Sequence, residues 1–163
     1  MYKHKKVGVF MYKVYQVKLS EAVYDFVNGP EGGHTETAKK FPEYNTHLET
    51  MHAGAKGYKP EMFEHYTQVC EVAEFEGQGS KLEEVFKILN GYYFDEDAGT
   101  DLVFEEFVSG FQMRTITRKD GEVVTFRDMH SLSVGDIVEH NGSFHIVDKW
   151  GFKEVETNTL EVA

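Results

Sequence analysis

The chain is poor in cysteine and proline and has no long apolar run. Its single cysteine, Cys70, cannot form an internal disulfide, which excludes a disulfide-stapled scaffold and favours a reducing compartment. No stretch reaches the roughly 18 apolar residues that a membrane-spanning helix needs, so no membrane partner is expected. A hydrophobic content of 40% with only three prolines argues against a disordered chain and indicates a packed core.

Positive charge is also scarce. The chain has 17 basic and 28 acidic residues, which gives a formal net charge of −11. Phosphate binding needs a basic face, so direct binding of nucleic acid is not expected. Two interpretations of the acidity stay open. It maintains solubility, or it steers the protein toward a basic target such as the DNA-binding cleft of another protein.

The N-terminal segment resembles a signal peptide only superficially. Lysines among residues 3–6 precede a short apolar run. The run is too short for a signal peptide, Lys13 interrupts it, and no small-residue cleavage site follows. We therefore expect a first strand at Val7–Leu19 and a cytoplasmic protein.

The C-terminal part contains short β-rich runs. Ile137-Val138 and Phe144–Val147 flank Asn141-Gly142, and these two turn residues both accept positive φ, which is a strong hairpin signal. Beyond them, Trp150 and Phe152 are separated by one glycine, so in an extended segment both rings would project to the same face. The pair is either a wedge in the core or an exposed anchor for a partner.

The whole pattern predicts a single α+β domain, in which a mixed or antiparallel sheet packs against several short helices and ends in the C-terminal hairpin. The predicted elements follow the expected positions of caps, apolar periods and turns. They are helices at Glu21–Val27 (capped by Ser20), Thr46–Met51, Pro60–Tyr66, Leu82–Leu89 (with a capping box at Ser80–Glu83) and Phe104–Phe111; a turn-rich mobile loop at Glu31–Lys40; a strand at Thr67–Phe75; and hairpin strands at Met113–Thr117 and Val123–Phe126.

An acidic stretch has the spacing of an EF-hand calcium loop. Asp95 and Asp97 fall at loop positions one and three, and Glu106 falls at the bidentate position twelve. Against this reading, a glycine occupies position five, so Thr100 would have to take the sharp turn that position six requires. The alternative is an acidic loop followed by a helix.

Other polar residues suggest chemistry only weakly. His130, Ser131, Ser133 and Asp136 form a possible ligand or polar cluster, although adjacent residues on an extended segment point to opposite faces. The serines are expected to satisfy backbone groups at the Val134–Asp136 bend.

Three further readings concern isolated side chains. Asp136 and Asp148 could be paired carboxylates, and cross-strand pairing could bring His140 and His145 together as a metal pair or as part of a polar strand face. Cys70 is expected to be a small core residue and not a nucleophile.

Several short motifs, taken in order, resemble the YodL-like family of small domains found in mobile elements and in multi-domain phage proteins. The matching segments are Val14–Lys18, Tyr66–Val69, Leu82–Phe86, Leu89-Asn90, His130–Val138, Ile146–Asp148 and Gly151–Val155. The resemblance covers most of residues 1–163 and is strongest in the last 30. It departs at about 91–128, which reads as an insertion in a single YodL-like domain. It implies a phage or conjugative-element accessory protein in a bacterial host, and it implies no particular chemistry.

We therefore expect a non-enzymatic accessory protein that binds and modulates a host protein, with inhibition as the expected effect; the target is a defence or nucleic-acid-processing factor in the host cytoplasm. No cofactor is expected, and the partner could present a basic surface. The expected partner-binding residues are Trp150, Phe152, Asp95, Asp97, Asp101, Glu105 and Glu106. Two alternatives stay open: a small hydrolase or nucleotide-modifying enzyme that uses His130–Asp136, and a calcium-binding module that uses Asp95–Glu106. The sequence identifies neither the partner nor the oligomeric state.

The misplaced glycine predicts that calcium binds no more tightly than about millimolar, the weak end of known sites. Titration calorimetry with Ca²⁺ measures this affinity, and Glu106→Gln serves as the control because it removes the bidentate ligand. A micromolar affinity that Glu106→Gln abolishes would contradict the prediction and favour a calcium-binding module.

Overall fold

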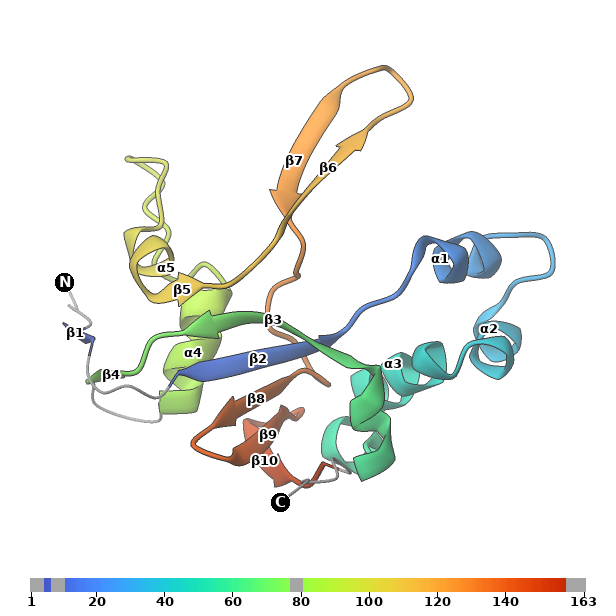
Figure 1. Cartoon of the computed structure of the whole chain (residues 1–163), viewed down its shortest axis with the longest axis horizontal. Helices are drawn as coiled ribbons and strands as arrows, with labels where there is room; N and C mark the ends of the chain where they lie inside the picture. Colours follow the sequence, from blue (N-terminus) through green and yellow to red (C-terminus); the bar gives the residue numbers. More distant parts are fainter. Residues whose placement is uncertain (1–4, 7–10, 77–80, 158–163) are drawn as a thin grey trace. The chain divides into compact units, whose positions relative to one another are not determined.

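The computed structural model describes residues 5–6, 11–76 and 81–157. The fold is α+β and includes a C-terminal hairpin, as the sequence predicted (Figure 1). The helices are α1 Glu21–Val27, α2 His34–Lys40, α3 Pro42–Ala53, α4 Lys81–Leu89 and α5 Leu102–Phe107, with two 3₁₀ helices, η1 Gly54–Gly57 and η2 Pro60–His65. The strands are β1 Lys5–Lys6, β2 Tyr12–Val17, β3 Tyr66–Val72, β4 Phe75–Glu76, β5 Val108–Ser109, β6 Met113–Thr117, β7 Val123–Arg127, β8 Ile137–His140, β9 Ser143–Val147 and β10 Phe152–Val155.

The main sheet has six strands in the order β10-β9-β8-β2-β3-β5, while β1-β4 and β6-β7 form two-stranded sheets. The pairs β1–β4, β3–β5, β6–β7, β8–β9 and β9–β10 are all antiparallel. The chain divides into two compact units. The first unit comprises residues 1–14 and 69–132, and the second comprises 15–68 and 133–163. Because the boundaries fall inside β2 and β3, each of these strands contributes to both units.

The predicted C-terminal hairpin is present in the second unit. Asn141 and Gly142 have φ values of 52° and 83°, the double positive φ that a tight two-residue hairpin turn requires. The register sets Ile137 opposite Ile146, and both side chains are fully buried. They share one apolar cluster with Tyr58, Met62 and Tyr66, which is packed by partly buried Tyr15, Val17, Ala55, Phe63, Phe144 and Val155. This cluster forms one apolar core of the second unit.

The prediction that Trp150 and Phe152 project to the same face of an extended segment is wrong. The Asp148 amide donates to the Gly151 carbonyl across a tight turn, and Gly151 has φ +76°. Aspartate at the first position and glycine in the left-handed region at the fourth are typical of a type I turn with a glycine bulge. Trp150 is therefore a turn residue, whereas Phe152 begins β10 opposite Val147. No atom lies within 4 Å of a Cβ built on Gly151, so its positive φ alone disfavours a larger residue there.

In the first unit, α4 buries Val85, Ile88 and Leu89, the i, i+3, i+4 pattern of an amphipathic helix. The helix ends where the sequence predicted, at Asn90-Gly91, and Gly91 has φ +72°. The predicted capping residue Ser80 lies outside the described residues. Cys70 is fully buried, and burial raises the pKa of its thiol to about 12, so it is a core residue as expected.

The segment expected to be an insertion at 91–128 is partly built into the core of the first unit. Phe104, Phe107 and Val108 are buried. Phe107 meets Phe75 edge to face at 6.2 Å between ring centroids, and β5 pairs with β3. The predicted helix at Phe104–Phe111 begins earlier and is shorter than expected, because the chain turns into β5 after Phe107.

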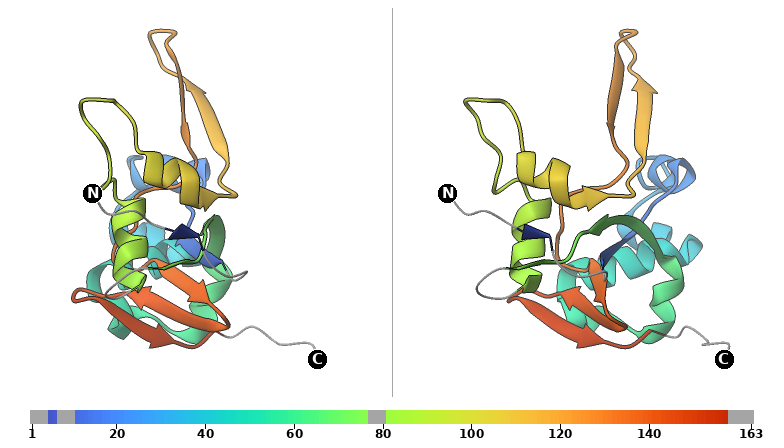
Figure 2. Two further views of the ribbon diagram at one scale, coloured as in Figure 1. Left: turned by 90° about the vertical axis from the view of Figure 1, so that its left-hand side faces the viewer. Right: turned by 60° about the vertical axis from the view of Figure 1, so that its left-hand side comes forward.

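The remainder of this segment forms the β6–β7 ribbon, the second hairpin that the sequence predicted. Gly121, with φ +89°, closes the turn between its strands. Every strand residue of the ribbon is exposed except half-buried Val124, so neither face is covered. Figures 1 and 2 show the ribbon extending away from α4 and α5 of the same unit.

Several predicted boundaries are corrected. Glu31–Lys40 is not one turn-rich loop, because His34–Lys40 forms α2, which packs beside α3 and fully buries Thr37. The helix predicted at Thr46–Met51 extends over Pro42–Ala53 as α3. The described part of the first strand, β2, ends at Val17 and not at Leu19, while residues 7–10 lie outside the described part. None of the described helices has the length and apolarity needed to cross a membrane.

The Ile137–Ile146 pair should dominate the stability of the second unit. Ile146→Ala leaves a cavity beside Ile137, so it should lower the free energy of unfolding by about 1–4 kcal/mol in urea titrations followed by circular dichroism. Ile116→Ala, on the exposed ribbon, is the matched control and should cost about 0.5 kcal/mol or less. Equal losses from the two variants would show that this pair is not a core contact.

Candidate partner-binding pocket

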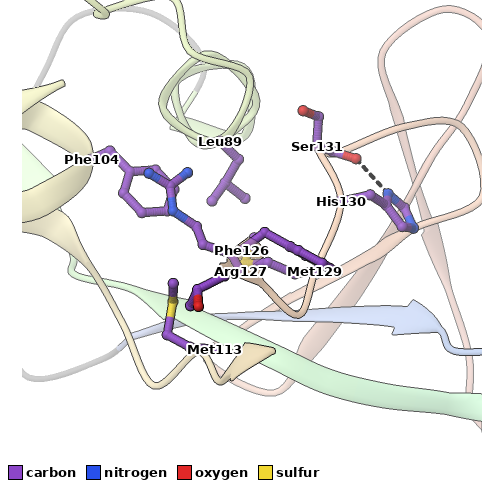
Figure 3. A pocket seen from close by; sticks show the side chains of 9 residues that line it. Leu89, Phe104, Met113, Phe126, Arg127, Met129, His130 and Ser131 are labelled. Atoms are coloured by element: carbon purple, nitrogen blue, oxygen red, sulfur yellow. Dashed lines mark hydrogen bonds between the residues drawn. The ribbon is translucent and has the colours of Figure 1, made fainter. Parts of the chain in front are cut away.

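A pocket of about 520 Å³ lies in the first unit, between the base of the β6–β7 ribbon, α5 and the end of α4 (Figure 3). This volume is within the range of pockets that hold small ligands or a few side chains. Its lining consists of Leu89, Phe104, Met113, Thr125, Phe126, Arg127, Met129, His130 and Ser131. Five of the nine lining residues have large apolar side chains, polar atoms form the larger share of the exposed lining, and one guanidinium group supplies fixed positive charge.

The register of the ribbon brings three of these side chains together. Met113 lies directly opposite Arg127, and Thr125 is two residues before Arg127 on the same strand. Directly paired residues and residues two apart share one face of a sheet, so all three project from the same face. The pocket therefore depends on the pairing of β6 with β7.

The Arg127 guanidinium is held over an aromatic ring. Its central carbon lies 3.7 Å from the ring centroid of Phe104 and 6.0 Å from that of Phe111, a cation–π arrangement that Figure 3 shows for Phe104. Phe104 is itself fixed, because its amide donates to the side chain of Asp101, the N-cap of α5, at 2.9 Å. Within the described residues the guanidinium has no carboxylate partner. Arg118, on the same ribbon, does have one, since it lies 3.6 Å from Glu122.

His130 and Ser131 lie at the rim of the pocket, but not as a nucleophile and base. His130 Nδ1 lies 2.7 Å from the backbone carbonyl oxygen of Ser131. A carbonyl only accepts hydrogen bonds, so Nδ1 carries the proton and donates. The imidazole is thereby oriented toward the main chain. It does not bind the Ser131 hydroxyl, which agrees with the expectation that adjacent side chains of an extended segment point to opposite faces.

Ser133 and Asp136 have a structural role in the second unit. Asp136 Oδ2 accepts hydrogen bonds from the Ser133 amide at 2.9 Å and from Gln16 Nε2 at 3.1 Å. The carboxyl group is nearly buried, and Gln16 is buried as well. The sequence predicted that the Ser133 hydroxyl binds a backbone group. It instead faces the carboxylate, at 3.5 Å from the same oxygen. This arrangement closes the bend that precedes β8.

Gly135 lies at the centre of the same bend, with φ +98° and closely packed surroundings. A Cβ at this position would lie 2.9 Å from the Thr50 hydroxyl and 3.1 Å from the Thr50 carbonyl carbon. The Tyr66 hydroxyl donates to the Gly135 carbonyl. Burial is the main cause that raises the pKa of Tyr66 far above its ordinary value, so the phenol stays protonated and continues to donate.

The acidic loop uses its carboxylates for local backbone contacts. Asp95 Oδ1 accepts from the amides of Asp97 and Ala98, and Asp95 also bridges to Thr100 across the turn. The positive φ of the loop, +68°, is at Gly99 and not at Thr100. Among the residues that the structure describes, no group of three or more His, Cys, Asp or Glu side chains is placed to hold a metal ion.

The remaining predicted residues are separated or differently used. Asp148 Oδ1 accepts from the Ala55 amide at 3.3 Å, while Asp136 binds Ser133 and Gln16 as described above. The β8–β9 register sets His145 opposite Val138, so His140 and His145 are diagonal neighbours on one face and not directly paired. Trp150 is 92% exposed, and Phe152 is half-buried.

Comparison with known proteins yields no relative: no protein-family model, no curated protein and no solved structure matches the chain. The likeness to the YodL-like family therefore remains an expectation from short motifs.

Sequence reasoning missed most of the pocket. His130 and Ser131 were singled out, but Phe104, Met113, Phe126 and Arg127 were not considered as site residues. A compositional signal was present, because the three arginines of the chain, Arg114, Arg118 and Arg127, all fall on the ribbon and its turn. Arginine is enriched at binding interfaces, so this clustering marks the ribbon as a candidate surface.

Removing the Asp136 carboxylate should destabilise the second unit. Asp136→Asn turns the charge-assisted hydrogen bonds from Gln16 and the Ser133 amide into neutral ones and puts an amide donor in place of the second carboxylate oxygen, so it should lower the free energy of unfolding by about 1–3 kcal/mol. Urea unfolding measures this loss. Asp97→Asn, on the exposed acidic loop, removes the same charge and should cost roughly 0.5 kcal/mol or less. If Asp136→Asn is as stable as the wild type, the carboxylate does not hold the bend.

Proposed function

We propose that this chain is a non-enzymatic binding protein that recognises another protein through exposed apolar and aromatic side chains. The proposal includes the context that the YodL-like resemblance implies: an accessory protein of a phage or mobile element that binds and inhibits a host protein in the bacterial cytoplasm. The target is of the defence or nucleic-acid-processing class, in keeping with that context.

The observation that carries the proposal is the uncovered β6–β7 ribbon. Met113, Ile116, Val123 and Phe126 are 37–64% exposed. A two-stranded ribbon has only marginal stability in water unless something packs against it. Apolar side chains on both faces of such a ribbon gain stability when a partner covers them.

Trp150 supports the same function from the second unit. Tryptophan is enriched among interface residues that contribute most to affinity, because its large ring buries much area at little entropic cost. Its place in a tight turn that Gly151 closes holds the ring at a protruding position. Charge adds to this picture, since a net charge of −11 speeds the encounter with a basic partner.

The use of the candidate catalytic residues also favours binding over catalysis. His130 donates to a backbone carbonyl, and Asp136 closes a structural bend with Ser133 and Gln16. General acid–base catalysis needs a side chain that can reach a substrate proton. The contacts of Asp136 direct its carboxylate to the protein's own chain, whereas the His130 bond only orients the imidazole.

Site-specific photo-crosslinking tests the proposal. p-Benzoylphenylalanine is placed at Val123 or at Trp150, and the protein is irradiated in host lysate. Both positions should give a discrete adduct with the same host protein, identified by mass spectrometry, because both lie on the proposed binding surfaces. The matched control is the same substitution at Tyr24, an aromatic on α1 that is 50% exposed and has no role in the proposal. No adduct from positions 123 and 150, or equal yields from all three positions, would sink the proposed function.

A further inference from the structure

Among the residues that the structure describes, an arginine without an acidic partner stands out in a protein with 28 acidic residues. The Arg127 guanidinium rests on Phe104, and in the described part of the chain it makes neither an ion pair nor a hydrogen bond. The aromatic ring restricts the guanidinium without occupying its N–H groups, which lie in the guanidinium plane. Arg127 is thus pre-positioned and keeps its donors available.

The surroundings of Arg127 define what could bind there. Leu89, Met113 and Met129 give the pocket apolar walls next to the guanidinium. A guanidinium fork matches the two oxygens of a carboxylate, and apolar walls match an aliphatic or aromatic group. The complementary ligand therefore carries a carboxylate beside an apolar group.

The free edge of β7 favours an extended protein segment as the source of that chemistry. In the described sheet β7 pairs with β6 alone, so its other edge has no neighbouring strand. Thr125, Phe126 and Arg127 of this strand line the pocket. An extended peptide can add its backbone to such an edge while its side chains enter adjacent pockets. Nucleic acid is disfavoured, because the net charge of −11 repels a polyanion.

We propose that the Arg127–Phe104 pocket binds an extended segment of the protein partner, in which an Asp or Glu carboxylate flanked by large apolar side chains pairs with the Arg127 guanidinium. This inference rests on the proposed function and defines the chemistry of the partner at one site. It also gives the acidic protein a specific preference for an acidic feature on its partner, alongside any general attraction to basic surfaces.

Peptide titration tests the pocket directly. The probe is the acetylated and amidated peptide Ser-Leu-Glu-Phe-Ser, whose only charge is the Glu carboxylate, added to the ¹⁵N-labelled full chain. Amide resonances of Phe104, Phe126 and Met129 should shift at millimolar peptide. The peptide Ser-Leu-Gln-Phe-Ser should bind about tenfold more weakly, the loss expected for one charge-assisted hydrogen bond. Ser-Ser-Glu-Ser-Ser, which lacks the apolar groups, should also bind more weakly.

Two arginine variants provide the control on the protein side. Arg127→Gln should abolish the preference for Glu over Gln, whereas Arg118→Gln removes the same charge from the same ribbon and should preserve it. The amide spectrum reports whether each variant keeps the hairpin. If Arg127→Gln disturbs the hairpin, the comparison of the three peptides on the wild-type chain still decides.

Three results would overturn the inference: equal binding of the Glu and Gln peptides, shifts away from the pocket, or equal effects of the two arginine variants. Binding of 4-phenylbutyrate as tight as that of the Glu peptide would overturn the protein segment as occupant, because the pocket would then take small acids.

The crosslinks from Val123 and Trp150 do not depend on Arg127. If host adducts form but the Glu and Gln peptides bind equally, the pocket inference is contradicted and the proposed function stands. If the peptides bind differently but no host adduct forms, the proposed function is contradicted and the pocket's preference for a carboxylate stands.

Discussion

The buried carboxylate of Asp136 is the interaction on which the second unit depends. An ionised carboxyl group is costly to remove from water unless hydrogen bonds replace its hydration. Gln16 from β2 and the Ser133 amide both donate to this carboxyl group, so these two hydrogen bonds need β2 and the bend before β8 to be in place together. The same bend requires Gly135, because Thr50 leaves no room for a Cβ. The bend thus contacts β2 through Asp136 and α3 through Gly135.

The elements that could be predicted from the sequence are those whose conformation is determined by a few neighbouring residues. The β8–β9 turn was predictable because Asn141 and Gly142 adopt positive φ by their own nature. Ser20 likewise caps α1 through its own hydroxyl, which accepts from the Val23 amide. In contrast, α2 was missed because its N-cap is Gly33, which has no capping side chain, and its helix is supported by packing on α3. Tertiary contacts of that kind leave no periodic mark in seven residues.

In the candidate pocket, too, locally determined structure was predictable and contacts between distant residues were not. The ribbon itself was predictable from Gly121 and the flanking β-rich runs, but the stacking of Arg127 on Phe104 joins two elements that are distant in sequence. Spacing cannot reveal such a pair, because it depends on how the ribbon leaves the sheet after β5. Asp101 was expected to contact a partner, yet it caps α5 and so positions the ring under the guanidinium. A surface charge and a structural cap look alike in sequence, and only their geometry separates them.

Trp150 is the single tryptophan of the chain and is 92% exposed. Its indole is surrounded by water in the native state, so its fluorescence emission already resembles that of an unfolded chain. Intrinsic tryptophan fluorescence is consequently a poor signal for denaturation of this protein, and the nine tyrosines or circular dichroism must be used instead. The same property makes the indole a selective optical reporter of its own surroundings. A blue shift in emission, or protection from acrylamide quenching, would register whatever covers that turn without interference from any other tryptophan.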